Sequence, residues 1–167
     1  MSDYRSLSEM TGLASDVLRR LVSQGHLVTD DPDGYRGVRR PFTGGDCFRA
    51  VVLAALARIG IPYAEAGKLV APLGCAGTVL TYAGKRHDQD AVLAVWTEEA
   101  SHEATALDKQ QAMHLLNRAG VGALVIVPLE RHWQVVAKHA EAQRANARGP
   151  KASGWARAFR RADGDHR

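Results

Sequence analysis

Residues 7–28, LSEMTGLASDVLRRLVSQGHLV, contain two short helical patterns that meet at a glycine. Gly12 ends the first pattern, for which Ser6 is the candidate N-cap because a glutamate follows it at capping-box spacing. The second pattern begins near Ser15 or the next residue and ends at Gly25, a common position for glycine just past a helix. Its expected buried face is Val17, Leu18, Leu21 and Val22. This arrangement predicts a helix-turn-helix.

The polar face of the second helical pattern carries side chains suited to DNA. In a helix-turn-helix, the second helix lies in the major groove and its first turns meet base edges. Arginine is the residue that most often reads guanine there. The DNA contacts that we predict from this helix are Ser15, Asp16, Arg19 and Arg20.

Residues 29–46, TDDPDGYRGVRRPFTGGD, combine a Pro-Asp-Gly turn signal with several arginines. We expect a wing, a β-hairpin that reaches the DNA backbone, and Thr43 as the cap of the helix that follows it. A guanidinium near a hairpin tip can bind phosphates, and an aromatic ring can pack on a sugar. The predicted backbone contacts are Tyr35, Arg36, Arg39 and Arg40.

Two more helical patterns follow the predicted wing, over residues 45–60 and 63–71, with Gly60 and Pro62 as the break between them. Each pattern presents one apolar face at helical spacing. The expected buried residues are Phe48, Val51, Val52, Ala55, Leu56 and Ile59 in the first pattern and Ala66, Leu69 and Val70 in the second.

The order helix, helix, wing, helix, helix resembles the MerR family of winged-helix transcriptional regulators. The motifs that carry the resemblance are Gly12-Leu13, Leu18-Arg19, Gly25-His26-Leu27, Arg40-Pro41-Phe42-Thr43 with Asp46, and Gly60-Ile61-Pro62. The resemblance covers roughly residues 4–71, and it implies a bacterial, sequence-specific transcriptional regulator that binds a palindromic operator as a homodimer. Arg20 and Leu21 stand where the family usually has aromatic residues, and no long coiled-coil pattern follows directly after residue 71.

The second half of the chain alternates between strand and helix patterns. Short β-prone runs at 78–83 and 91–96 predict a hairpin, and the apolar run at 123–127 suits a central strand. Helical patterns run from Asp108 to Arg118 and over residues 129–147. The predicted fold is therefore mainly α with a small β part, an α+β chain. Its expected domains are a winged helix-turn-helix at 1–73, a three-stranded α+β module at 74–147 and a flexible basic tail at 148–167.

The α+β module has two possible roles. Sheet edges favour pairing with a second copy, and we expect a homodimer. The alternative is a sensing module with a ligand pocket. Its candidate lining residues are Tyr82, Trp96, His114 and Trp133.

Charge is distributed unevenly along the chain, whose net charge is +4. Residues 1–46 hold six arginines against seven acidic residues, whereas residues 138–167 hold eight basic residues against three acidic ones. DNA binding by the N-terminal part therefore depends on where its arginines lie rather than on a general positive field. The tail, with Trp155 and Phe159 at helical spacing, is a candidate contact for DNA or for RNA polymerase.

Other classes of function lack a supporting pattern. The two cysteines and seven histidines show no zinc-ligand spacing, and no nucleophile elbow or phosphate-binding glycine loop occurs. We expect no enzyme activity, no cofactor and no metal. The chain also lacks a long apolar run and a signal-peptide pattern, which predicts a cytoplasmic, nucleoid-associated protein without membrane contact. Two alternatives stay open: an excisionase-like accessory protein that bends DNA in recombination, and a winged helix that binds proteins.

Overall fold

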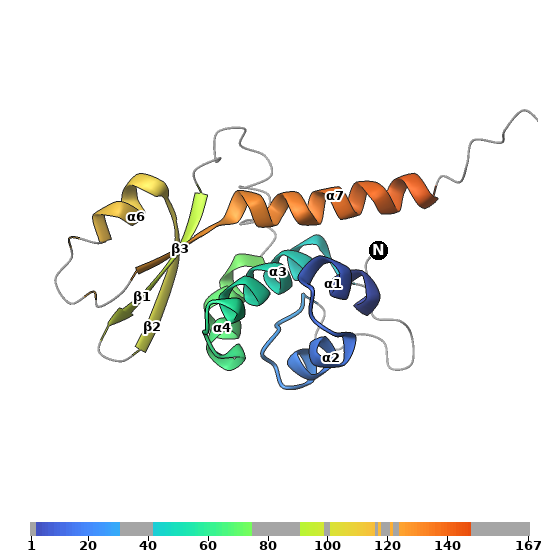
Figure 1. Cartoon of the computed structure of the whole chain (residues 1–167), viewed down its shortest axis with the longest axis horizontal. Helices are drawn as coiled ribbons and strands as arrows, with labels where there is room; N and C mark the ends of the chain where they lie inside the picture. Colours follow the sequence, from blue (N-terminus) through green and yellow to red (C-terminus); the bar gives the residue numbers. More distant parts are fainter. Residues whose placement is uncertain are drawn as a thin grey trace, which may run out of the picture.

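The structure is a computed structural model that describes residues 3–30, 42–74, 91–98, 101–115, 117, 121 and 124–147. In these residues six α-helices accompany one three-stranded antiparallel sheet, so the predicted α+β class is confirmed (Figure 1). The elements are α1 (Tyr4–Thr11), α2 (Ser15–Ser23), α3 (Gly44–Arg58), α4 (Tyr63–Val70), the 3₁₀ turn η1 (Ala71–Gly74), β1 (Ala91–Glu98), β2 (Ser101–Asp108), α6 (Lys109–Leu115), β3 (Leu124–Pro128) and α7 (Leu129–Ala147).

Helices α1 and α2 end where their glycines predict. Gly12 has a positive φ of 71° and donates its N–H to the carbonyl of Ser8, while Gly25, just past α2, has a φ of 73°. The predicted cap of α1 was wrong by one turn. Asp3 caps the helix by accepting a hydrogen bond from the backbone N–H of Ser6 at 2.9 Å.

Helix α3 is the centre of the helical part. The predicted Thr43 cap is confirmed: Thr43 and Asp46 form a reciprocal capping box at its start. Eleven of its 15 residues are buried, so α3 is enclosed on several sides instead of exposing one polar face. The predicted burial of Ile59 was wrong, because this residue lies just past the helix end and is 54% exposed.

The sheet has the order β2-β1-β3, and both neighbours of β1 are antiparallel to it. Ala94 of β1 lies opposite Thr105 on one side and Ile126 on the other. Strand β3, which covers all but the first residue of the apolar run at 123–127, is therefore an outer strand of the described sheet and not the central strand that was predicted. The run at 91–96 takes the central position because both neighbours pair with it.

Strand β2 was missed in the sequence, where its residues, SHEATALD, are mostly small or polar. Such residues have weak strand propensity, and the pairing with β1 overrides that preference. The helix expected from Asp108 accordingly begins one residue later, as α6, and its described part ends at Leu115. The predicted strand at 78–83, its hairpin with 91–96, and the tail lie outside the described residues.

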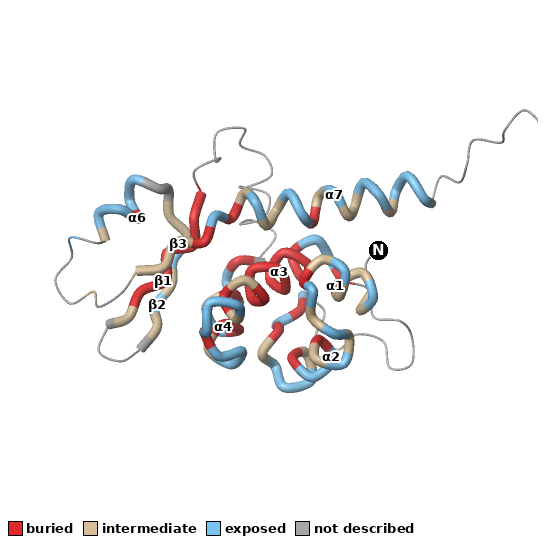
Figure 2. The backbone as a smooth tube through the Cα atoms, in the orientation of Figure 1, coloured by how far each residue is buried: buried red, intermediate tan, exposed pale blue. Residues whose placement is uncertain are grey.

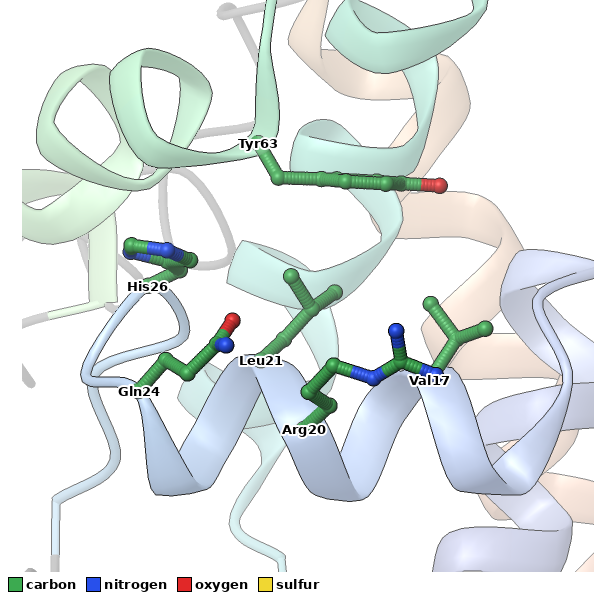
Figure 3. Close-up of a pocket in the computed structure, with 6 residues that line it drawn as sticks. All are labelled: Val17, Arg20, Leu21, Gln24, His26 and Tyr63. Carbon is green, nitrogen blue, oxygen red and sulfur yellow. The ribbon is translucent and has the colours of Figure 1, made fainter.

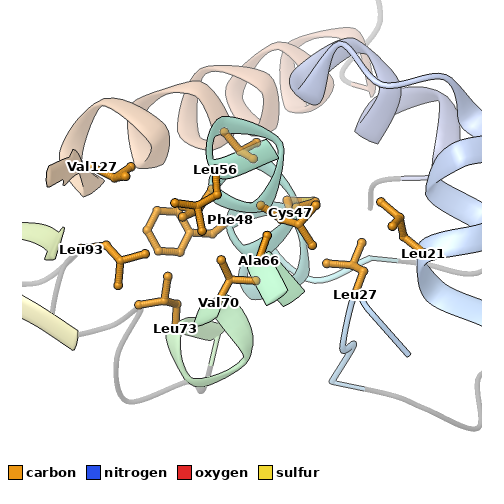
Figure 4. Close-up of a cluster of buried hydrophobic side chains, with 14 of the residues drawn as sticks. Leu21, Leu27, Cys47, Phe48, Leu56, Ala66, Val70, Leu73, Leu93 and Val127 are labelled. Atoms are coloured by element: carbon orange, nitrogen blue, oxygen red, sulfur yellow. The ribbon is translucent and has the colours of Figure 1, made fainter. Parts of the chain in front are cut away.

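Successive side chains of a strand point to opposite faces of the sheet, and in the central strand β1 both sets of side chains are buried. Leu93 and Val95 join the main apolar cluster with α3, α4 and α7, which Figure 4 shows around Phe48, while Val92, Ala94 and Trp96 pack with Ala112 of α6 in a second cluster. Figure 2 shows the buried residues concentrated in α3 and where the sheet meets the helices. The main cluster therefore runs across the predicted domain boundary at residue 73.

Helix α7 lies along α3 and α1 and extends past them (Figure 1). Trp133 meets Phe48 of α3 edge to face, with ring centroids 5.8 Å apart. Burial lowers the pKa of His132, and the positive charges of Arg58 and Arg131 lower it further. His132 is thus half-buried on α7, near Arg58 of α3.

Candidate nucleic-acid interface

Helix α2 has one buried and one exposed face. Leu18 and Leu21 are buried in the main cluster, whereas Val17 and Val22 are only partly buried. On the opposite side Asp16, Arg19 and Arg20 are exposed. Two adjacent arginines therefore stand on an open helical surface that the packing of α2 against the core holds in place.

Arg19 is positioned by an aromatic ring of α1. Its guanidinium carbon lies 5.4 Å from the ring centroid of Tyr4, a distance at which a cation attracts an aromatic face. The Tyr4 ring in turn meets Phe42 edge to face at 4.9 Å. Phe42 directly follows residues 31–41, which belong to the predicted wing and lie outside the described residues. This series of contacts therefore connects α2 with the described residue at the end of that segment.

The other three predicted contacts of α2 differ in their surroundings. The Arg20 guanidinium lies 4.0 Å from the carboxylate of Asp16 one turn earlier, and both side chains are largely exposed. Such a surface pair is worth little and leaves the arginine able to bind an anion. Ser15 is half-buried, and its hydroxyl donates a long hydrogen bond of 3.4 Å to the carbonyl of Tyr4. Ser15 therefore connects α2 to α1.

The predicted backbone contacts Tyr35, Arg36, Arg39 and Arg40 lie outside the described residues. The two ends of their segment are described and lie together. The hydroxyl of Thr43 donates to a carboxylate oxygen of Asp30 at 2.6 Å, and the backbone N–H of Asp30 donates to Asp46 at 2.9 Å. The chain thus leaves at Asp30 and returns at Phe42 to nearly the same place.

A buried arginine also connects the two ends of this segment. The side chain of Arg49 is 3% exposed, and its guanidinium donates to Asp46 at 2.7 Å and to Asp30. The backbone N–H of Thr43 also donates to Asp46, at 2.8 Å. We define Asp30, Thr43, Asp46 and Arg49 as the loop-base network. It is the part of the site that the sequence analysis missed, although Asp46 and Arg49 stand one helical turn apart after a recognised cap.

The electrostatics of the loop-base network favour its ionised form. Burial raises the pKa of Asp30, but the hydrogen bonds from Thr43 and Arg49, together with the charge of Arg49, outweigh burial and lower this pKa below its ordinary value. Burial disfavours the charge on Arg49, and its hydrogen bonds and attraction to Asp30 and Asp46 outweigh that effect and raise its pKa. Asp30 and Arg49 therefore stabilise each other's charges.

A hollow lies between α2 and α4, beside Arg20 (Figure 3). Its volume is about 340 Å³. In Figure 3, the Tyr63 ring at the start of α4 faces α2 across the hollow, and Arg20 and Leu21 lie on the opposite side. The lining residues are Val17, Arg20, Leu21, Gln24, His26 and Tyr63.

The residues considered for a ligand pocket in the α+β part are not brought together. Trp96 packs under α6, and Trp133 packs on Phe48 in the other apolar cluster. His114 is exposed on α6, and Tyr82 lies outside the described residues. The described residues therefore do not form the predicted pocket.

Comparison of the chain with protein-family models and with curated proteins finds no match. No helix in the described part of the chain is long and apolar enough to cross a bilayer.

Proposed function

We propose that this chain is a sequence-specific, double-stranded-DNA-binding regulator of transcription, similar to MerR regulators, that places α2 in the major groove. The observation that carries the proposal is the exposed pair Arg19 and Arg20 on a helix whose opposite face is buried. A helix so mounted can enter a groove without unfolding, and arginine forks match the acceptor pair of guanine.

The loop-base network supports a second DNA contact in this proposal. Because Asp30 and Thr43 are held together, residues 31–41 leave and rejoin the helical part beside α1, whose Tyr4 contacts both Arg19 and Phe42. We propose that Arg36, Arg39 and Arg40 bind phosphates from this segment and that Tyr35 packs on the backbone. Phosphate contacts set register and affinity, and α2 would supply sequence preference.

The test is selection of duplexes from a random pool by the full chain, followed by affinity measurements over a range of salt concentrations. Enrichment of one motif and a steep loss of affinity with salt are expected. Arg19→Ala should cost about 1–3 kcal/mol on the selected site, as expected for a lost bidentate contact with guanine. Arg131→Ala, an exposed arginine on α7, is the matched control and should leave binding unchanged.

Two results would contradict the proposal. Binding without sequence enrichment would remove the reading role of α2 and favour a DNA-bending accessory protein. Absence of salt-dependent DNA affinity would favour a protein-binding module instead.

A further inference from the structure

The hollow between α2 and α4 has the size of a small-molecule site. Its volume of about 340 Å³ falls at the lower end of the range of about 300–1,000 Å³ that ligand pockets occupy. Val17 and Leu21 supply an apolar wall, and the polar groups come from Arg20, Gln24 and His26. An apolar wall with few polar groups is the usual composition of such sites.

Backbone packing sets the width of the hollow. Gly67 of α4 lies so close to the chain after α2 that a Cβ atom built on it would stand 2.1 Å from the carbonyl oxygen of His26. Helix α4 therefore rests on backbone and cannot move closer to α2. Tyr63, at the start of the same helix, lies across the hollow from Leu21 (Figure 3). The space between an aromatic ring and a leucine suits a flat apolar group.

The charge of the hollow selects an anion. None of the described lining residues is acidic, and the carboxylate nearest to Arg20 in the described structure, that of Asp16, is 4.0 Å away and largely exposed. A guanidinium on an apolar surface binds a carboxylate through two parallel hydrogen bonds. In Figure 3 the Arg20 guanidinium lies along α2 beside Val17, at the border of the apolar wall.

We infer that this hollow binds a small planar aromatic carboxylate, with the ring between Tyr63 and Leu21 and the carboxylate on Arg20. The binding itself is independent of the proposed function. Its consequence rests on that function: Arg20 belongs to the helical face proposed to read DNA, so a bound acid would occupy one of the two arginines and weaken DNA binding.

The test uses indole-3-carboxylate as the probe, titrated into the full chain without DNA and followed by calorimetry. Saturable binding with a Kd of about 1 mM or below is expected for a ligand of this size. Indole-3-carboxamide, which has the same shape without the charge, should bind at least about tenfold more weakly. Inorganic phosphate, an anion without a ring, should show no saturable binding in the same range.

Variants locate the site. Arg20→Gln and Tyr63→Ala should each weaken binding of indole-3-carboxylate by about tenfold or more, whereas Arg19→Gln should not change it. Arg19 is the matched control because it is the neighbouring exposed arginine and contacts Tyr4 rather than the hollow. Circular dichroism melting curves establish that each variant is folded.

Three outcomes would overturn the inference: no saturable binding of the carboxylate, equal binding of phosphate, or full binding by folded Arg20→Gln.

Competition between indole-3-carboxylate and DNA is then measured on the selected DNA site. Carboxylate binding without any DNA binding would leave the inference standing and reject the proposed function. DNA binding without carboxylate binding would do the reverse.

Discussion

Arg49 shows how a single buried charge organises the helical part. Its side chain lies in α3, is 3% exposed, and is surrounded by the carboxylates of Asp46 and Asp30. Asp46 is equally buried, at 2% exposed, whereas Asp30 is 40% exposed. A buried ion costs several kcal/mol unless a partner and further hydrogen bonds compensate it. Arg49 and Asp46 pair with each other, and the backbone N–H groups of Asp30 and Thr43 donate further hydrogen bonds to the Asp46 carboxylate. The network therefore depends most on its two buried members, Arg49 and Asp46.

We predict that Arg49→Met lowers the free energy of unfolding by about 3–5 kcal/mol, because it leaves the buried carboxylate of Asp46 without its cation. Urea denaturation at neutral pH measures the effect. Asp30→Asn is the comparison, and its cost should stay below about 1 kcal/mol because the lost carboxylate is partly solvated. Equal costs for the two variants would contradict the role assigned to burial.

The Asp30→Asn variant should also differ from the parent chain in how its stability depends on pH. Its pKa in the folded chain is below the ordinary value of 3.8, so the ionised form is favoured by folding. That contribution to stability is present above pH 3.8 and is lost as the pH falls from there through the folded pKa. Asp30→Asn should therefore lose less stability over this acidic range than the parent chain.

At the scale of elements, the contact between α4 and the exit of α2 decides the geometry of the candidate site. Gly67 permits backbone contact with His26, and a residue with a Cβ atom does not fit at this position. Tyr63 and Arg20 lie on opposite sides of the hollow (Figure 3). Periodicity predicted both helices but contained no sign of this contact, because it joins residues about forty positions apart.

We predict that Gly67→Ala destabilises the chain by about 1–3 kcal/mol or more, since the methyl group would meet a backbone carbonyl that cannot move aside cheaply. Thermal melting followed by circular dichroism measures it. Gly44→Ala is the matched control: nothing lies within 4 Å of a Cβ at that helical position, so the change should be neutral or stabilising. A Gly67→Ala variant as stable as the parent would show that α4 can shift.

At the scale of the whole molecule, one apolar cluster unites the helical part with the sheet and α7. Both faces of β1 are covered, so exposed apolar area on this strand is no argument for a partner. The outer strands β2 and β3 do offer such an argument, because within the described sheet each pairs with a neighbour on one side only. Unpaired backbone groups along such edges favour pairing with another chain.

We predict that the full chain is a homodimer with two-fold symmetry, which a palindromic operator would match. Sedimentation equilibrium at micromolar concentration should give twice the chain mass of 18.1 kDa. The control is a nuclease-treated sample at high salt, where association bridged by nucleic acid is lost and strand pairing persists. A monomer under both conditions would reject the prediction.

Short-range signals in the sequence were enough to predict several boundaries. Gly12, Gly25 and the Thr43 cap end or begin helices through contacts within a few residues. Periodicity predicted α2, α3, α4 and α7 as helices, but only four of the eleven buried residues of α3 were expected to be buried. The exposure of Arg19 and Arg20 was predicted for the same reason, because the face of a helix on which a residue lies follows directly from its spacing.

The tertiary structure decided what depends on residues far apart in the chain. Strand β2 forms because β1 pairs with it, against weak local propensity. The partnership of Arg49 with Asp30 and the closeness of Gly67 to His26 arise only when separate elements pack together. Capping and periodicity are local properties that a sequence displays, whereas pairing, buried charge networks and hollows between helices are set by the packing of the whole chain.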